Sequence, residues 1–271
     1  QEIAKDLGFQ QISISHEVSP LVKIVGRGDT TVVDAYLSPI LLNYINLIGK
    51  QFQEGKKRPN IRFMQSSGGL IDRELFRGRD CILSGPAGGI IGGVKTSMDA
   101  GFKKIITFDM GGTSTDVAHF SGDYERTLEN EVAGVRMRTP MLKIHTIAAG
   151  GGSILKYEDG RMKVGPESAG AEPGPSCYRK NGPLTVTDAN LLLGRIRPDR
   201  FPSVFGPNGD KTLDKEIVGK KFKEITEKIN NETGSSRSPE EIAKGFLDIA
   251  VENMAQAIKT ISTMRGYDVS D

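Results

Sequence analysis

A glycine-containing turn between two strand-like segments constrains this chain more than any other feature. Residues 104–108 (Lys-Ile-Ile-Thr-Phe) and 115–120 (Thr-Asp-Val-Ala-His-Phe) have the composition of strands, and the first segment leads directly into Asp109. Gly111 and Gly112 let the backbone turn without Cβ clashes, so their N–H groups can point at phosphate oxygens. Thr113 adds a hydroxyl donor, and Thr115 begins the return strand. The pattern predicts a phosphate-binding hairpin over residues 104–120, with these glycines and threonines as nucleotide-binding candidates.

The carboxylates that flank the turn point to a metal ion. A carboxylate beside a phosphate is repulsive by itself, so we expect Asp109 to hold Mg²⁺, which takes one or two carboxylates plus phosphate oxygens. Asp116 is either a second carboxylate of the site or a hydrogen-bond partner that fixes the turn. The alternative is a tight β-turn in which Asp109 bonds its own backbone. Asp109 and Asp116 are the candidate catalytic residues.

A second glycine cluster, Gly150–Gly152, lies within residues 145–153 (His-Thr-Ile-Ala-Ala-Gly-Gly-Gly-Ser) in a β-like part of the chain. Glycine makes up 33 of 271 residues, against a usual share of about 7%. Gly151 and Gly152 can line a nucleotide pocket where Ser153 and His145 contact a small substrate. A flexible strand-to-strand turn explains the same glycines. His145 is alternatively a half-buried strand residue or a proton carrier matched to neutral pH.

A third cluster, residues 84–89 (Ser-Gly-Pro-Ala-Gly-Gly), follows the apolar run 81–83, which we expect to be a strand. The residues from Gly89 to Thr96 almost spell a P-loop, but Val94 stands where the second glycine belongs and the lysine falls inside the following helix. Two interpretations stay open: an anion-favouring helix N-terminus, or close helix–strand packing through glycine.

The composition excludes several classes of protein. With 36 basic and 34 acidic residues the formal net charge is +2, so no electrostatic argument favours nucleic acid or an anionic membrane. The densest basic stretch, Lys56–Arg58, is interpreted as a solvated loop. Cys81 and Cys177 are too few for a disulfide framework and predict free thiols in a cytoplasmic protein. No apolar run is expected to span a membrane, and a chain that begins at Gln1 suggests a fragment.

Strand patterns alternate with helical patterns, which predicts the α/β class. The consecutive strands of residues 104–147 indicate antiparallel pairs as well, so we expect a mixed sheet. Ser238–Glu241 forms a capping box with proline at the first helical position. The other expected elements are strands at 11–15 and 61–64 and helices at 30–53 (with a possible interruption at Pro39), 89–100, 187–193 and 211–230.

Several runs together resemble the hydantoinase A/5-oxoprolinase (N-methylhydantoinase) family. They occur in order across nearly the whole chain, which is more specific than any one loop. The matching runs are Ser13–Ser19, Met64–Gly69, Leu83–Gly89, Thr107–Val117, Ala149–Ser153, Gly165–Pro175, Leu184–Asn190 and Met264–Asp268.

The resemblance implies an actin-like or sugar-kinase-type ATPase with two ribonuclease-H-like lobes around ATP. Each lobe of such proteins contributes one phosphate hairpin, and the Asp109 hairpin resembles that of the second lobe. Residues 1–271 are then a hydantoinase A-type domain fragment. The first-lobe hairpin and the glycine-rich adenosine loop are expected before Gln1 and after Asp271, and the stretch between Gly69 and Arg79 is shorter than the family pattern.

Members of the family activate an amide or ketone oxygen with ATP. The resemblance therefore implies a small cyclic amide or ketone as substrate, a hydantoinase B-type partner subunit and an oligomer. Phosphorylation of the amide oxygen makes the carbon a better electrophile, and catalysis of such transfer is mostly positioning and charge neutralisation. The favoured hypothesis is an ATP-dependent cyclic amide hydrolase. The alternatives are an ATP-dependent ketone carboxylase subunit and a non-catalytic actin-like nucleotide-binding module, and the Gly/Pro-rich loop 165–175 favours a small-molecule enzyme over the latter.

Overall fold

The computed structural model describes residues 1–52, 60–132 and 134–269, which group into two compact units. Unit 1 comprises Gln1–Thr107 and His119–Ile144, and unit 2 comprises Phe108–Ala118 and His145–Asp271. The chain, expected to be one domain fragment, divides inside the strands at residues 104–110 and 115–121. The basic stretch Lys56–Arg58 lies outside the described residues.

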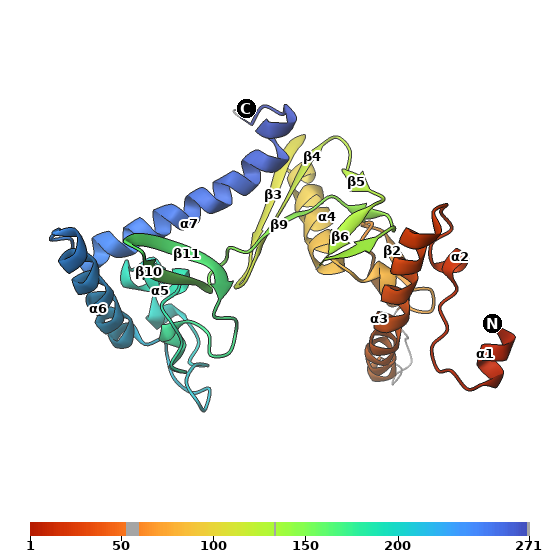
Figure 1. The fold of residues 1–271 in the computed structure, drawn as a ribbon, viewed down its shortest axis with the longest axis horizontal. Helices are drawn as coiled ribbons and strands as arrows, with labels where there is room; N and C mark the ends of the chain where they lie inside the picture. The colour runs from red at the N-terminus through yellow and green to blue at the C-terminus, as the bar shows by residue number, and fades with distance from the viewer. Residues whose placement is uncertain (53–59, 133, 270–271) are drawn as a thin grey trace. The chain divides into compact units, whose positions relative to one another are not determined.

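Unit 1 combines one long helix, shorter helices and small two-stranded sheets (Figure 1). Its elements are α1 (Glu2–Asp6), α2 (Ser15–Val18), α3 (Ile24–Gln51), β1 (Arg62–Met64), β2 (Leu70–Asp72), η1 (Gly78–Asp80), α4 (Ser84–Asp99), β5 (Arg126–Thr127), β6 (Asn130–Val132), β7 (Val135–Met137) and β8 (Met141–Leu142). The expected strand at 61–64 is confirmed. The expected strand at 11–15 is wrong, because these residues lead into α2.

A buried carboxylate holds α3 in unit 1. Asp34 is 2% exposed. One of its oxygens accepts hydrogen bonds from the backbone N–H of Arg79 at 3.2 Å and from the Ser38 hydroxyl at 3.3 Å, and the other accepts from the Ser13 hydroxyl at 2.7 Å. Buried carboxylates are tolerated when donors satisfy both oxygens. Helix α3 also continues through Pro39, without the predicted interruption.

Helix α3 also has the length and apolarity of a membrane span. Among the described helices it alone passes this test, with a mean hydropathy of 1.3 over its best window, of which 22% is buried. The expectation that no apolar run reaches this length is therefore wrong by that criterion. Core helices of soluble proteins, which are mostly buried, and signal sequences near an N-terminus pass the same test. Asp34 within α3 bonds protein groups outside the helix.

Residues 81–89 differ from the sequence prediction. Cys81–Leu83 form a turn instead of a strand, and Leu83 takes a left-handed conformation with φ 58° immediately before α4. Helix α4 begins at Ser84, so the glycines that were expected to form a loop lie within its first turns. The P-loop alternative fails, because the whole near-match from Gly89 to Thr96 is helical. Three apolar residues were too short a run to specify a strand against the helix that follows.

Strands β3 (Lys104–Met110) and β4 (Thr115–Ser121) form the predicted hairpin. The sheet has the order β3-β4-β9, with β9 at His145–Ile147. Because β3 lies at the edge of this sheet, its side chains are half-buried or exposed. The α/β class is confirmed. The strand pairs of defined register within the described residues are all antiparallel.

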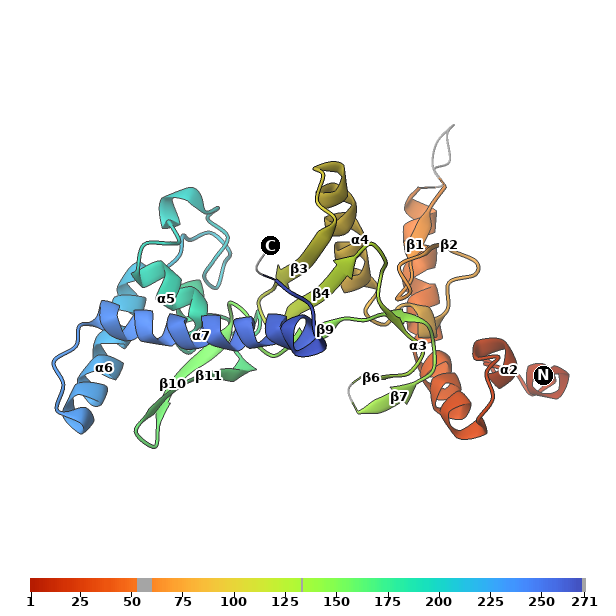
Figure 2. The ribbon, with the colours of Figure 1, turned by 90° about the horizontal axis from the view of Figure 1, so that it is seen from above.

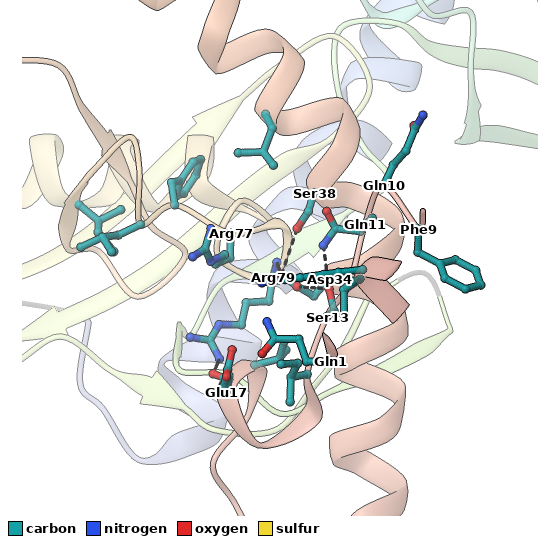
Figure 3. A pocket seen from close by; sticks show the side chains of 18 residues that line it. Gln1, Phe9, Gln10, Gln11, Ser13, Glu17, Asp34, Ser38, Arg77 and Arg79 are labelled. Atoms are coloured by element: carbon teal, nitrogen blue, oxygen red, sulfur yellow. Dashed lines mark hydrogen bonds between the residues drawn. The ribbon is translucent and has the colours of Figure 1, made fainter. Parts of the chain in front are cut away.

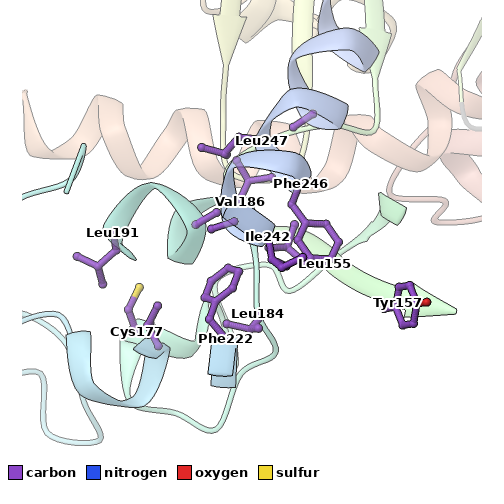
Figure 4. Close-up of a cluster of buried hydrophobic side chains, with 14 of the residues drawn as sticks. Leu155, Tyr157, Cys177, Leu184, Val186, Leu191, Phe222, Ile242, Phe246 and Leu247 are labelled. Carbon is purple, nitrogen blue, oxygen red and sulfur yellow. The ribbon is translucent and has the colours of Figure 1, made fainter. Parts of the chain in front are cut away.

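Unit 2 places three helices against a hairpin of two strands (Figure 2). Its further elements are β10 (Ser153–Glu158), β11 (Arg161–Ser168), η2 (Ser176–Tyr178), α5 (Val186–Leu192), η3 (Pro198–Arg200), α6 (Lys215–Thr233), α7 (Pro239–Ile261) and η4 (Thr263–Arg265). Phe222, Ile242 and Phe246 are fully buried at the centre of its core, which Figure 4 shows between α6, α7 and β10. Removing one such aromatic side chain typically costs about 3–5 kcal/mol.

The capping box predicted for the last long helix is confirmed. The Ser238 hydroxyl accepts from the N–H of Glu241 at 3.2 Å, and the Glu241 carboxylate accepts from the N–H of Ser238 at 2.7 Å. From Pro239 onward, buried residues recur every three or four positions, as the 3.6-residue period requires. The helix ends at Ile261, and η4 and then Gly266, with φ +86°, follow it.

Candidate functional site

The candidate residues all lie in unit 2, at the turn of the β3–β4 hairpin and in the glycine loop at 150–152. This loop docks on the turn through its backbone. The N–H of Gly151 donates to the carbonyl of Gly111 at 3.0 Å, and the N–H of Gly152 donates to the carbonyl of Gly112 at 2.6 Å. The two glycine clusters that the sequence analysis treated separately are therefore one structure.

Only glycine permits this approach. A Cβ atom on Gly150 would lie 2.7 Å from the carbonyl oxygens of both Gly111 and Gly112, and one on Gly152 would lie 2.9 Å from that of Gly112. Distances under 3.0 Å to backbone atoms are not seen for real Cβ atoms. Close backbone approach therefore explains these glycines, in place of the flexible turn that the sequence left open.

The docking determines where the free donors of the turn point. In a trans peptide the C=O and the following N–H lie on opposite sides, and the bonds after Gly111 and Gly112 are trans. Because both carbonyls face the glycine loop, the N–H groups of Gly112 and Thr113 face away from it. Neither N–H has a hydrogen-bond partner among the described residues. Two adjacent, exposed N–H groups with a common direction form an anion-binding nest.

Asp109 is exposed at the end of β3, and its carboxylate has no hydrogen-bond or ion-pair partner among the described residues. The alternative in which Asp109 bonds its own backbone is therefore not observed. No group of three or more His, Cys, Asp or Glu side chains able to hold a metal occurs in the described ranges. A single free carboxylate is compatible with Mg²⁺, which usually takes one or two carboxylates and completes its coordination with phosphate oxygens and water.

Asp116 and Thr115 make protein contacts in the return strand. The Thr146 hydroxyl donates to the Asp116 carboxylate at 2.5 Å, across the pairing of β4 with β9. The Thr115 side chain is fully buried, and its hydroxyl donates to the carbonyl of Ala149 at 2.6 Å. Asp116 was expected to be either a second carboxylate of the site or a hydrogen-bond partner that fixes the turn. The structure shows it as a hydrogen-bond partner, and the bond joins β4 to β9. Thr115 likewise anchors the strand to the segment that leads into the glycine loop.

Ser153 and His145 were expected to contact a substrate. Ser153 is 1% exposed, and its hydroxyl accepts from the N–H of Gly150 at 2.9 Å, so it closes the glycine loop. His145 is half-buried in β9 opposite Val117. The N–H groups of Gly151 and Gly152 donate hydrogen bonds to the hairpin turn. A substrate or nucleotide contact for these four residues stays a prediction.

Two polar residues near the glycine loop, Thr187 and Ser168, were not among the residues predicted from the sequence. The backbone N–H and the hydroxyl of Thr187 both donate to the carbonyl of Gly151 at 2.8 Å. The Ser168 hydroxyl lies 3.4 Å from that of Thr113 and accepts from the N–H of Gly170 at 3.1 Å. Both residues belong to runs that carry the family resemblance, which was the signal available to find them.

Unit 1 contains a separate polar cavity of about 700 Å³. Figure 3 shows Ser13, Asp34 and Ser38 converging on its wall, beside Arg77 and Arg79. The hydrogen bonds of Asp34 with Ser13, Ser38 and the Arg79 backbone account for both of its oxygens. This network joins three parts of unit 1: helix α3, the segment that precedes α2, and η1. Its role is structural, because it holds these elements together.

Comparison with known proteins places this geometry in a family. A sequence model described as Hydantoinase/oxoprolinase matches residues 27–271. The 5-oxoprolinase of Saccharomyces cerevisiae is 47% identical over 99% of this chain. The chain spans 21% of that protein's length.

Two solved structures share the fold. The ATP-dependent caprolactamase from Pseudomonas jessenii superposes with a TM-score of 0.75 at 36% identity, over 98% of this chain and 38% of that one. The curated sequence of its alpha subunit is 38% identical over 94% of this chain and 36% of its own length. A nucleotide-free acetone carboxylase gives a TM-score of 0.78 at 26% identity, over 98% of this chain and 37% of that one.

Proposed function

The chain belongs to the hydantoinase/oxoprolinase family, and on that premise we propose that it carries part of the nucleotide site of an ATP-dependent cyclic amide hydrolase. The observation that supports this most directly is the pair of free N–H groups at Gly112 and Thr113, which the docked carbonyls of the hairpin turn direct outward. Such a nest binds phosphate oxygens. The exposed Asp109 carboxylate beside it would attract a divalent cation.

Each residue has a defined part in this proposal. The N–H groups of Gly112 and Thr113 and the Thr113 hydroxyl would bind and orient the phosphates, and Asp109 would hold Mg²⁺. ATP, when bound, supplies the phosphoryl group that activates the amide oxygen. Donors fixed before the reaction need no reorganisation as charge develops, which is the main source of electrostatic catalysis. The glycine loop at 150–152 provides that fixation, because it bonds both carbonyls of the turn.

The nature of the relatives supports a cyclic amide as substrate. The 5-oxoprolinase and the caprolactamase are named for cyclic amides, and both are more similar to this chain than the acetone carboxylase at 26% identity. Ketone carboxylation is the second candidate, supported by the TM-score of 0.78 to that carboxylase.

A hydantoinase B-type partner is part of the proposal. The caprolactamase relative is a subunit alpha, and this chain spans 36% of it but only 21% of the yeast 5-oxoprolinase. The 5-oxoprolinase is therefore the longer chain, with room for the partner region in the same polypeptide. A cytoplasmic location is proposed from the free thiols of Cys81 and Cys177. An oligomer is proposed from the family resemblance alone.

The test is substrate-dependent ATP hydrolysis by the full-length protein, with a hydantoinase B-type subunit added where that subunit is a separate chain. ADP release is measured with Mg²⁺ and, in turn, 5-oxoproline, a hydantoin, caprolactam, and acetone with bicarbonate. Stimulation by a cyclic amide, with ring-opened product equal to the ADP released, supports the proposal. Stimulation by acetone and bicarbonate alone replaces it with the carboxylase function. Nucleotide binding that no substrate stimulates would indicate an actin-like module without chemistry of its own.

A further inference from the structure

A continuous series of hydrogen-bonded peptide groups runs from Thr187 to the phosphate nest. The N–H and the hydroxyl of Thr187 donate to the carbonyl of Gly151. That carbonyl shares its peptide group with the N–H of Gly152, which donates to the carbonyl of Gly112. The Gly112 carbonyl in turn shares its peptide group with the free N–H of Thr113. Every donor in the series points in one direction, toward the nest.

A second series ends on the other donor of the nest. The N–H of Ala169 donates to the carbonyl of Gly152, and the N–H of Ser153 donates to the carbonyl of Gly150 at 3.1 Å. The N–H of Gly151 then donates to the carbonyl of Gly111, whose peptide group carries the free N–H of Gly112. This second series consists of backbone groups alone. The first series includes a side chain, the Thr187 hydroxyl, at its start. A substitution at Thr187 can therefore remove this donor without changing the backbone.

We propose that Thr187 is a positioning residue for the phosphate nest and acts through the peptide groups of Gly151–Gly152 and Gly112–Thr113. Hydrogen bonds in a chain polarise one another, so a donor at the start strengthens the donor at the end. The hydroxyl of Thr187 adds a second donor to a carbonyl that its own N–H already contacts. The hydroxyl polarises the Gly151–Gly152 peptide group, whose N–H bonds the hairpin turn. It also holds this peptide group in position, and through it the turn. This inference rests on the proposed function of the hairpin as a phosphate site.

The geometry around Gly151 supports a fitted contact. A Cβ atom on Gly151 would lie 2.9 Å from the Thr187 hydroxyl oxygen, so only glycine lets the hydroxyl reach the carbonyl beneath it. Thr187 is half-buried in the first turn of α5, and no other side chain in the described residues donates to the Gly151 carbonyl. The Thr187 side chain therefore contributes a hydrogen bond to the Gly151 carbonyl in addition to its packing contacts.

The test compares Thr187→Val, which keeps the shape and removes the hydroxyl, with Thr187→Ser, which keeps the hydroxyl. The matched control is Thr226→Val in α6, because the Thr226 hydroxyl is buried and has no hydrogen-bond partner among the described residues. In the full-length protein we expect Thr187→Val to raise KM for ATP about two- to tenfold, the range of one hydrogen bond. KM for the amide substrate should not change, Thr187→Ser should restore the ATP value, and Thr226→Val should match the wild type.

A second readout needs no activity. Hydrogen exchange of the nucleotide-free protein, read by mass spectrometry, should be faster in Thr187→Val for peptides covering 150–153 and unchanged there in Thr226→Val. Faster exchange with a selective rise in KM for ATP supports the inference. Unchanged hydrogen exchange at residues 150–153 in Thr187→Val overturns the inference. A Thr187→Ser variant with the same rise in KM for ATP as Thr187→Val also overturns it. So does a loss of kcat at constant KM, which would reflect a smaller fraction of folded enzyme. If the wild type shows no substrate-dependent ATP hydrolysis, the proposed function fails, and the exchange data alone decide the inference.

Discussion

The carbonyl oxygen of Gly112 accepts a 2.6 Å hydrogen bond from the N–H of Gly152, and this contact joins the hairpin turn to the glycine loop. With the bond from the N–H of Gly151 to the carbonyl of Gly111, it turns both carbonyls toward the glycine loop and the N–H groups of Gly112 and Thr113 away from it. A turn of this length free in solution would interconvert among several conformations. The second loop selects the one in which the N–H groups of Gly112 and Thr113 face away from it.

The first prediction concerns Gly150, which lies closest to the turn. In Gly150→Ala the added Cβ would stand 2.7 Å from two carbonyl oxygens, so the backbone of one loop must move. Forced overpacking typically lowers the free energy of unfolding by about 1–3 kcal/mol. We expect that loss in chemical denaturation, together with a fall in ATP turnover that exceeds the fall in folded fraction.

The control for this variant is Gly219→Ala. Gly219 lies in α6, where an added Cβ meets no atom within 4 Å. Alanine in a helix interior should raise the free energy of unfolding by about 0.5–1 kcal/mol and leave turnover unchanged. A Gly150→Ala protein as stable and active as the wild type would show that the loop does not need to dock closely.

Local signals in the sequence specified the hairpin and the last helix. Strand-forming residues on both sides of Gly111 and Gly112 define β3 and β4, and Ser238 with Glu241 defines the start of α7. Each of these signals acts between residues close in sequence, so it can be recognised without the fold. The prediction failed at Cys81–Leu83, where three apolar residues matched a strand but form the turn before α4. Intrinsic propensity does not favour a helix that begins with this many glycines, so no local signal revealed where α4 starts.

The contacts that complete the site act between residues far apart in sequence. Nothing local in Gly150–Gly152 reveals that these residues bond the hairpin, and the part played by Thr187 depends on where α5 packs. Asp34 is likewise buried by partners from other segments of unit 1. Such contacts follow from tertiary packing, and the family resemblance indicated the runs that contain them without giving their geometry.

The second prediction concerns the pH dependence of stability. Cys177 is fully buried, and burial, together with the adjacent Asp188 carboxylate, raises the pKa of its thiol well above the usual range. In the unfolded chain the thiol ionises near its ordinary pKa of 9.0. The folded state therefore retains a proton that the unfolded state loses, and its stabilising contribution is complete below pH 9 and declines as pH rises beyond it.

The measurement is the free energy of unfolding between pH 7 and pH 11 for the wild type and for Cys177→Ala. Above pH 9 the wild type should lose up to about 1.4 kcal/mol per pH unit more than the variant, the limit for one proton. Cys81, whose pKa burial also raises, is present in both proteins and cancels in the comparison. Equal slopes would mean that the Cys177 thiol is accessible to hydroxide in the folded protein.

The last prediction concerns Asp109. Asp109→Asn in the full-length protein should nearly abolish ATP turnover while the melting temperature stays the same. The side chain has no partner among the described residues, so the change breaks no structural contact. It does remove the charge that would attract a Mg²⁺ ion beside the phosphates. Loss of one such contact typically costs about 3–4 kcal/mol, or two to three orders of magnitude in rate.

Thr113→Ala is the graded comparison for Asp109→Asn. It should cost less, because its hydroxyl is one neutral donor beside the N–H groups of Gly112 and Thr113. Turnover and melting temperature are measured for both variants, with turnover followed over a range of Mg²⁺ concentrations. If the carboxylate holds the metal, the residual activity of Asp109→Asn should need more Mg²⁺ than the wild type, whereas Thr113→Ala should keep the wild-type requirement. An Asp109→Asn enzyme with more than about a tenth of wild-type turnover would place the metal elsewhere, since so small a loss is less than one charged contact contributes.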